Sequence, residues 1–229
     1  MAARRRVTLI SVSGIDGAGK STLINLLRDR LAEASTRVEV LSFWECVVAL
    51  PRMREFLSHV VLGGERGIGS PAKPVKRRDK NVRTWYLTTA RLCLYLLDAV
   101  RLRLVVARVM SGTAQVAIFD RYIYDELANL SPDHWFVRGY VRLLLKLIPQ
   151  PDIAYLLDAD PARARERKPE YPLEFLLGNR ASYLALSQRI QGMTVIGPLP
   201  AADAGQGVAR EVLTMLASRS PQWLPAVRA

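Results

Sequence analysis

The stretch Val7-Thr-Leu-Ile-Ser-Val-Ser-Gly-Ile-Asp-Gly-Ala-Gly-Lys-Ser-Thr22 decides the fold. It opens with β-prone residues and continues into Gly14–Ser21, which matches the pattern G-x-x-x-x-G-K-[S/T] of a phosphate-binding loop. Leucines then recur at helical spacing between positions 23 and 31. The segment therefore predicts a strand, a glycine-rich loop and a helix, which is the setting in which this loop binds a nucleotide.

The chemistry of the loop follows from its residue types. Glycines let successive backbone N–H groups turn inward around phosphates, and the following helix adds its positive N-terminal end. Lys20 is expected to reach the β and γ phosphates of ATP, and the Ser21 hydroxyl to bind Mg²⁺. The predicted ATP-binding residues are Gly14, Ile15, Asp16, Gly17, Ala18, Gly19, Lys20, Ser21 and Thr22.

The remainder of the chain alternates between strand and helix patterns. This alternation predicts an α/β fold with a mostly parallel, five-stranded sheet covered by helices on both faces, of the P-loop NTPase type. The predicted strands are Val7–Ser13, Arg37–Phe43, Val116–Phe119, Ile153–Leu157 and Thr194–Ile196. The predicted helices are Thr22–Glu33, one near Arg52–Val61, one or two within Thr84–Met110, Trp135–Ile148, one at Asp160-Pro161, Arg180–Gln191 and Gly207–Ser218. Asp160 is expected to cap its helix, with Pro161 at the first helical position.

Length and composition limit the classes of protein to which the chain can belong. A chain of 229 residues suits one domain, and residues 44–83 are expected to be irregular because glycine and proline interrupt them. The net charge of +12 favours anionic partners, although no nucleic-acid-binding motif is present. Arginines and lysines interrupt the longest apolar runs, so no membrane span is predicted and a cytoplasmic protein is expected. Cys46 and Cys93 do not indicate a disulfide framework or a zinc site.

A second motif follows the buried strand that ends at Asp120. In a parallel sheet, Asp120 and Arg121 would reach the same edge as the glycine-rich loop, and so would Asp158 after the fourth predicted strand. A carboxylate there can bind Mg²⁺ through water, and a guanidinium can neutralise charge on a phosphoryl group. Alternatively, the two residues would form a surface salt bridge with no role in catalysis.

The chain resembles the thymidylate kinase family of nucleoside monophosphate kinases. The resemblance rests on Gly14–Thr22, Phe119-Asp-Arg-Tyr122 and Pro151-Asp-Ile-Ala-Tyr-Leu-Leu-Asp-Ala-Asp-Pro161, with a similar layout at Arg180–Tyr183. It implies phosphoryl transfer from ATP to a small anionic acceptor, dTMP being the leading expectation. The acceptor-binding residues that it implies are Asp16, Arg91, Arg121 and Tyr122.

The resemblance also implies a mobile lid, at about residues 163–180, whose arginines bind the triphosphate. Arg163 and Arg167 lie four residues apart and share one helix face, whereas Arg165 points elsewhere. Arg163 and Arg167 are therefore the favoured catalytic candidates, beside Lys20 and Arg121. A solvated basic helix without a catalytic role is the alternative.

The acceptor side departs from the family. In place of its usual Arg-Glu-Pro-Gly-Gly-Thr-like segment, this chain has Ser42-Phe-Trp-Glu-Cys-Val47. Two alternatives therefore stay open: a kinase on the same scaffold that acts on a glycan or lipid precursor, and a nucleotide-switched binding module. The basic segment 73–83 and a homodimeric assembly are likewise left open.

Overall fold

The sheet has five parallel strands in the order β2-β3-β1-β4-β5. The computed structural model describes residues 7–50, 85–130, 135–197 and 201–219. The strands are β1 (Thr8–Gly14), β2 (Val38–Ser42), β3 (Val116–Asp120), β4 (Ile153–Leu157) and β5 (Met193–Ile196). The predicted fold class is confirmed, because every pairing in the sheet is parallel and helices cover both faces.

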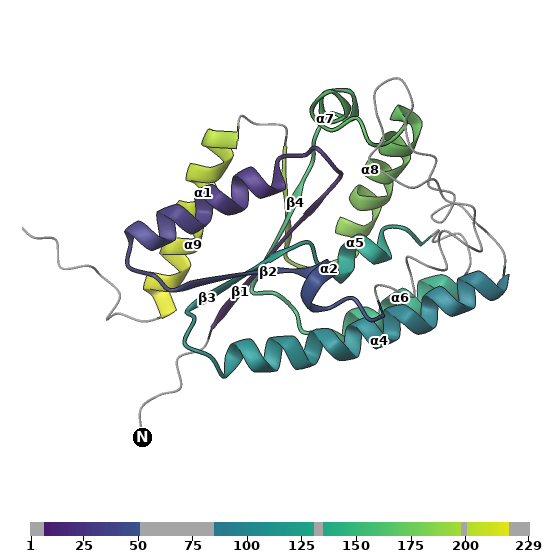
Figure 1. The fold of residues 1–229 in the computed structure, drawn as a ribbon, viewed down its shortest axis with the longest axis horizontal. Coiled ribbons are helices and arrows are strands. Elements are labelled where there is room, and N and C mark those ends of the chain that lie inside the picture. Colours follow the sequence, from purple (N-terminus) through teal and green to yellow (C-terminus); the bar gives the residue numbers. More distant parts are fainter. Residues whose placement is uncertain (1–6, 51–84, 131–134, 198–200, 220–229) are drawn as a thin grey trace, which may run out of the picture.

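Helices lie in two layers around the sheet (Figure 1). One layer contains α1 (Lys20–Glu33) and α9 (Ala201–Arg219), which pack against each other. The other layer contains α2 (Phe43–Cys46), α4 (Trp85–Met110), α5 (Ile123–Leu127), α6 (Trp135–Leu147) and α8 (Leu173–Ser187). The short helix α7 (Pro161–Arg167) lies at the carboxyl end of the strands, beside the glycine-rich loop.

Each face of the sheet has its own hydrophobic core. Ile10 and Val12 of β1 belong to the core under α1 and α9, and Leu9 belongs to the core under the other helices. This division follows from strand geometry, because successive side chains point to opposite faces. β1 is the central strand and is buried throughout its length, including its polar residues Thr8, Ser11 and Ser13.

Register explains why three chain segments meet at one edge. Val12 of β1 is aligned with Asp120 of β3, and Gly14 is aligned with Leu157 of β4. Asp120, the loop after Gly14 and Asp158 therefore leave the sheet together, as the sequence predicts.

Several helix boundaries differ from the predicted ones. α8 begins at Leu173 rather than Arg180, and α9 begins at Ala201 rather than Gly207. α2 and α5 are not predicted, and the one or two helices predicted within Thr84–Met110 are a single helix, α4, from Trp85 to Met110. The predicted helix near Arg52–Val61 and the basic segment 73–83 lie outside the described residues. Within the described residues, no helix has the length and hydrophobicity needed to cross a membrane.

A buried carboxylate ties the segment after β2 to α4. Asp98 is fully buried, and it accepts a 2.6 Å hydrogen bond from the backbone N–H of Ala49. Three residues later on α4, Arg101 donates a 3.1 Å hydrogen bond to the carbonyl of Val48. Because a buried N–H without a partner is costly, this anchor fixes where the chain passes after α2.

Replacing this anchor should destabilise the protein. Asp98→Ala leaves the N–H of Ala49 buried without this acceptor and should lower the free energy of unfolding by about 2–3 kcal/mol. Asp29→Ala is the matched control, because Asp29 pairs with Arg28 in solvent and its loss should cost less than about 0.5 kcal/mol. Urea denaturation of the two variants measures the difference, and equal losses would contradict the anchor.

Candidate active site

The glycine-rich loop is closely packed against β4 and α7. Gly14, Gly17 and Gly19 all have positive φ angles, of 146°, 81° and 94°, which favour glycine. A Cβ on Gly14 would lie 2.6 Å from the carbonyl oxygen of Leu157, and one on Gly17 only 2.2 Å from that of Ala164. The loop therefore requires glycine both for its backbone conformation and for its contact with neighbouring backbone.

Lys20 is buried within the loop. Its Nζ donates hydrogen bonds of 2.8 and 2.9 Å to the carbonyl oxygens of Gly14 and Ile15. Burial lowers the pKa of Lys20 to about 8, and the positive charge of Arg121 adds to this effect. An anion at the loop would oppose both effects and favour the protonated amine, so this position suits phosphate binding.

Arg121 links the loop to the opposite side of the site. Its guanidinium forms an ion pair with Asp16 of the loop, and its Nη1 lies 3.4 Å from the Oδ1 of Asp125. Burial alone would lower the pKa of Arg121, but the charges of Asp125 and Asp16 outweigh burial and raise it. The guanidinium is therefore a fixed positive charge beside Lys20.

The backbone of Arg121 has an unusual conformation. Its φ is 66°, in the left-handed region that non-glycine residues seldom adopt. The N–H of Arg121 donates a 3.0 Å hydrogen bond to the carbonyl of Val12 on β1. Strain of this kind is retained where surrounding contacts fix the conformation, and it is concentrated at functional sites.

Asp125 is the hub of a buried hydrogen-bond network that extends from Arg121. Its Oδ2 accepts hydrogen bonds from the Ser13 hydroxyl at 2.7 Å and from the Tyr122 backbone N–H at 3.1 Å. Its Oδ1 accepts a 2.6 Å hydrogen bond from the Tyr183 hydroxyl. Residues from β1, α5 and α8 therefore share one carboxylate, which holds Arg121 toward the loop.

The predicted Mg²⁺ residues lie at the same edge of the sheet. Asp120 is half-buried at the end of β3, and within the described parts of the chain its carboxylate has no hydrogen-bond partner. Ser21 is exposed in the first turn of α1. A free carboxylate and a hydroxyl are oxygen ligands of the kind that Mg²⁺ binds alongside water and phosphate, so these residues fit the ion.

Helix α7 holds the candidate lid arginines. The Asp160 carboxylate caps its first turn by accepting the N–H of Ala162 at 2.8 Å, and Pro161 occupies the first helical position, as the sequence predicts. The Nη1 of Arg167 lies 3.8 Å from the position of a Cβ on Gly19, so its guanidinium is beside the loop. Arg163 is exposed one turn earlier on the same face.

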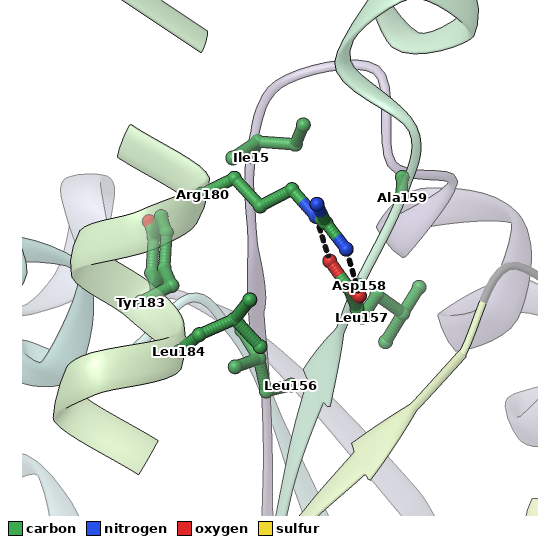
Figure 2. Close-up of a pocket in the computed structure, with 8 residues that line it drawn as sticks. All are labelled: Ile15, Leu156, Leu157, Asp158, Ala159, Arg180, Tyr183 and Leu184. Carbon is green, nitrogen blue, oxygen red and sulfur yellow. Dashed lines mark hydrogen bonds and ion pairs between the residues drawn. The ribbon is translucent and has the colours of Figure 1, made fainter. Parts of the chain in front are cut away.

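A second ion pair lies on the other side of the loop. Figure 2 shows Arg180 of α8 reaching Asp158 at the end of β4, beside Ile15 and in line with Tyr183 on the same helix. The two hydrogen bonds between the guanidinium and the carboxylate measure 2.5 and 2.7 Å. This pair lines a small pocket and connects α8 to the strand that precedes α7.

Arg91 and Tyr122, which are both predicted to bind the phosphoryl acceptor, lie in different environments. Arg91 is half-buried in the first half of α4. The Tyr122 side chain is fully buried, packs against Phe119 and donates a 2.6 Å hydrogen bond to the carbonyl of Pro149. The structure therefore places the Tyr122 ring in the core, where it supports the backbone of Arg121 rather than lining the open site.

Sequence reasoning missed Asp125 and recognised Arg180 and Tyr183 only by their layout. One signal for Asp125 was present: it lies three residues after Tyr122, the spacing at which a carboxylate caps the start of a helix. The spacing of Arg180 and Tyr183 also places both on one helix face. The contacts with Asp158 and Asp125 depend on the tertiary fold and leave no local pattern.

Known proteins resemble this chain along most of its length. It is 30% identical over 192 residues to a probable thymidylate kinase of Pyrobaculum aerophilum, covering 78% of this chain and 82% of the relative. It is 29% identical over 183 residues to a probable thymidylate kinase of Methanobrevibacter smithii, covering 77% and 79%. A probable thymidylate kinase of Archaeoglobus fulgidus is 28% identical over 165 residues, covering 69% and 68%.

No family model matches the chain, so its membership rests on these relatives. Together with the parallel sheet, they show that this chain belongs to the thymidylate kinase family and is a kinase.

Proposed function

We propose that this kinase transfers the γ-phosphoryl group of ATP to dTMP. The observation that carries the proposal is the fixed Arg121 guanidinium, held by Asp125 and Asp16 next to Lys20. Two cations at the end of a phosphate loop suit a transferring phosphoryl group, whose negative charge must be neutralised. The chain from 1 to 229 would form one kinase domain.

On the donor side, Gly14–Thr22 would bind the triphosphate of ATP. The Nζ of Lys20 would exchange its bonds to the loop carbonyls for bonds to the β and γ phosphates. Ser21 and Asp120 would hold Mg²⁺, which would offset the negative charge of the phosphates. The lowered pKa of Lys20 supports this exchange, since binding an anion relieves the cost of a buried cation.

During transfer, Arg121 and the arginines of α7 would stabilise the charge on the phosphoryl group. Arg167 is the leading candidate because its guanidinium lies beside Gly19, and Arg163 follows it on the same face. Residues 163–180 would act as a lid that brings these side chains to ATP. An acceptor phosphate is already anionic near neutral pH, so direct in-line transfer needs no covalent intermediate or general base.

On the acceptor side, Asp16 would contact the sugar and Arg91 the phosphate of dTMP. The names of the three relatives support thymidylate as the acceptor. The segment after β2 differs from the family pattern: it forms the short helix α2, and Asp98 and Arg101 anchor its continuation to α4. The base side of the acceptor pocket would therefore be built from other residues than in the family.

The acceptor is tested by comparing nucleoside monophosphates. Among dTMP, dUMP, dCMP, dAMP and dGMP, dTMP should give the fastest ATP-dependent ADP release in a coupled assay. At a concentration of about 100 Kd, it should also stabilise the folded protein by about 2–3 kcal/mol, measured as a raised Tm. Lys20→Ala is the control: it should keep its fold by circular dichroism but lose ADP release. ADP release stimulated by a sugar or lipid headgroup, and by none of the nucleotides, would refute the dTMP proposal.

The lid assignment is tested by a pair of variants on α7. Arg167→Met should lower kcat by about a hundredfold, because it removes a charge beside the phosphate loop. Arg165→Met removes the same charge from a different face of the helix and should retain kcat within about threefold. Steady-state kinetics with saturating ATP separates the two variants, and equal losses would argue against a specific role for Arg167.

The Asp125 network is tested with tyrosine variants. Tyr183→Phe removes one hydrogen bond from Asp125, so Arg121 should be held less firmly and kcat should fall by about tenfold. Tyr155→Phe is the matched control, because the Tyr155 hydroxyl bonds to the carboxylate of Glu211 on the other face of the sheet. Both variants should lose about 1–3 kcal/mol of stability in urea denaturation, but only Tyr183→Phe should lose kcat. If both keep the kcat of the wild type, the network is structural only.

A further inference from the structure

An ion pair joins the two ends of the segment 158–180, which contains α7. Asp158 follows β4 directly, and Arg180 lies in the middle of α8. The Nε and Nη2 of Arg180 donate hydrogen bonds of 2.5 and 2.7 Å to the two carboxylate oxygens of Asp158 (Figure 2). Because α7 lies between these two residues in the sequence, the pair closes the base of the segment that carries α7.

Each end of this segment is also attached to the body of the fold. The backbone N–H of Asp158 donates a 2.8 Å hydrogen bond to the carbonyl of Ile196 on β5. One turn after Arg180 on α8, the buried Tyr183 hydroxyl bonds to Asp125. A guanidinium that donates two parallel hydrogen bonds to one carboxylate fixes both distance and orientation. The pair therefore sets how far α8 lies from the end of β4, and thus where α7 can lie between them.

Helix α7 is in direct contact with the phosphate loop. A Cβ on Gly17 would lie 2.2 Å from the carbonyl oxygen of Ala164, so the two backbones touch. The Arg167 guanidinium lies beside Gly19, and Asp160 caps the first turn of the helix. A shift of α7 relative to β4 would therefore change the packing of the loop and the place of the guanidinium together.

The pair lies next to the first residues of the loop as well. Ile15 lines the small pocket beside Asp158 and Arg180 and is only 2% exposed. The carbonyl of Ile15 accepts a 2.9 Å hydrogen bond from the Nζ of Lys20. The same contact thus lies between the loop on one side and the start of α7 on the other.

The exposure of Arg180 separates a positioning role from a purely structural one. Its side chain is 40% exposed, and ion pairs that solvent can reach add little to the free energy of unfolding. The main effect of losing the pair should be local, because the segment 158–180 gains conformational freedom when its base is no longer closed. Arg180 should therefore matter more for the placement of α7 than for global stability.

We propose that Arg180 is a positioning residue whose pair with Asp158 clamps α7, and the Arg167 side chain on it, against the phosphate loop. Arg180 acts through α7, since its Nε and Nη2 are already bonded to Asp158. The proposal rests on the lid described above, because it assigns a role to the base of that lid. It does not depend on which nucleoside monophosphate is the acceptor.

Hydrogen–deuterium exchange of the full chain without nucleotide tests the clamp directly. In Arg180→Met, the backbone amides of α7 should exchange at least about tenfold faster than in the wild type, while those of β4 stay within about twofold. The Tm should stay within about 4 °C of the wild type. Arg189→Met is the matched control, because it removes an exposed arginine just beyond the end of α8 and should change neither segment.

Two results of the exchange experiment would overturn the proposal. One is unchanged exchange in α7 of Arg180→Met. The other is equal acceleration in α7 and β4, which would show that the variant loosens the whole fold rather than α7 alone.

Steady-state kinetics tests whether the clamp acts through Arg167. Arg180→Met should lower kcat/KM for ATP about tenfold, and Arg180→Lys, which keeps the charge but not the paired hydrogen bonds, should lower it less. Where Arg167→Met is already present, adding Arg180→Met should lower kcat/KM by less than about twofold, because the guanidinium that the clamp places is gone. A full tenfold further loss in the double variant would show that Arg180 acts on ATP by itself and would overturn the proposal.

The two experiments separate the clamp from the role given to Arg167. If Arg167→Met keeps the kcat/KM of the wild type while Arg180→Met speeds exchange in α7, the clamp on α7 stands and the lid assignment of Arg167 fails. If Arg167→Met lowers kcat/KM while Arg180→Met leaves exchange in α7 unchanged, the lid assignment stands and the clamp fails. Both sets of variants are assayed with the nucleoside monophosphate that the wild type phosphorylates fastest, so neither result depends on dTMP.

Discussion

The carboxylate of Asp125 is the constraint on which the site depends. A buried carboxylate is costly unless its oxygens are hydrogen-bonded, and here the donors come from Ser13, Tyr122 and Tyr183, with the charge of Arg121 added. Each donor belongs to a different part of the fold, so the carboxylate is satisfied only when the central strand, α5 and α8 are all in place. Once it is satisfied, it fixes Arg121 in a strained backbone conformation facing the loop. The contacts that bring these three segments together therefore also position Arg121 in the site.

The charges around the loop are arranged for an anionic ligand. The charge of Arg121 adds to burial in lowering the pKa of Lys20, and the carboxylates of Asp125, Asp16 and Asp120 act in the opposite direction. The Lys20 amine meanwhile uses the loop's own carbonyl groups as hydrogen-bond acceptors. An entering phosphate would replace these weak acceptors with charged oxygens and would bring Lys20 back toward its ordinary pKa. The loop therefore suits an anionic ligand such as phosphate better than it suits its own carbonyl groups.

Local patterns predicted those parts of the fold that local chemistry determines. The glycine-rich loop, the buried strands and the cap formed by Asp160 and Pro161 are encoded by neighbouring residues, and the structure confirms them. The last helix is predicted to begin at Gly207, but α9 begins at Ala201. In the structure Gly205 lies inside the helix, where a Cβ would be only 2.9 Å from the side chain of Leu26 on α1. Gly205 thus allows close packing between α1 and α9, which are distant in sequence, and Asp125 connects three separate segments. Neither role can be predicted from the neighbouring residues, because both depend on the tertiary fold.

The composition of helix α4 does not show which of its sides is buried. Its apolar residues surround the helix, as in a helix buried on all sides, yet only the side with Leu102, Val106 and Val109 enters the core. The opposite side adds nothing to folding by burial, because Val100 and Leu104 remain in solvent. Exposed leucine and valine favour aggregation, and this cost is retained only where another contact uses them. One side of α4 therefore supports the catalytic fold, while its other side keeps apolar residues exposed on the single chain.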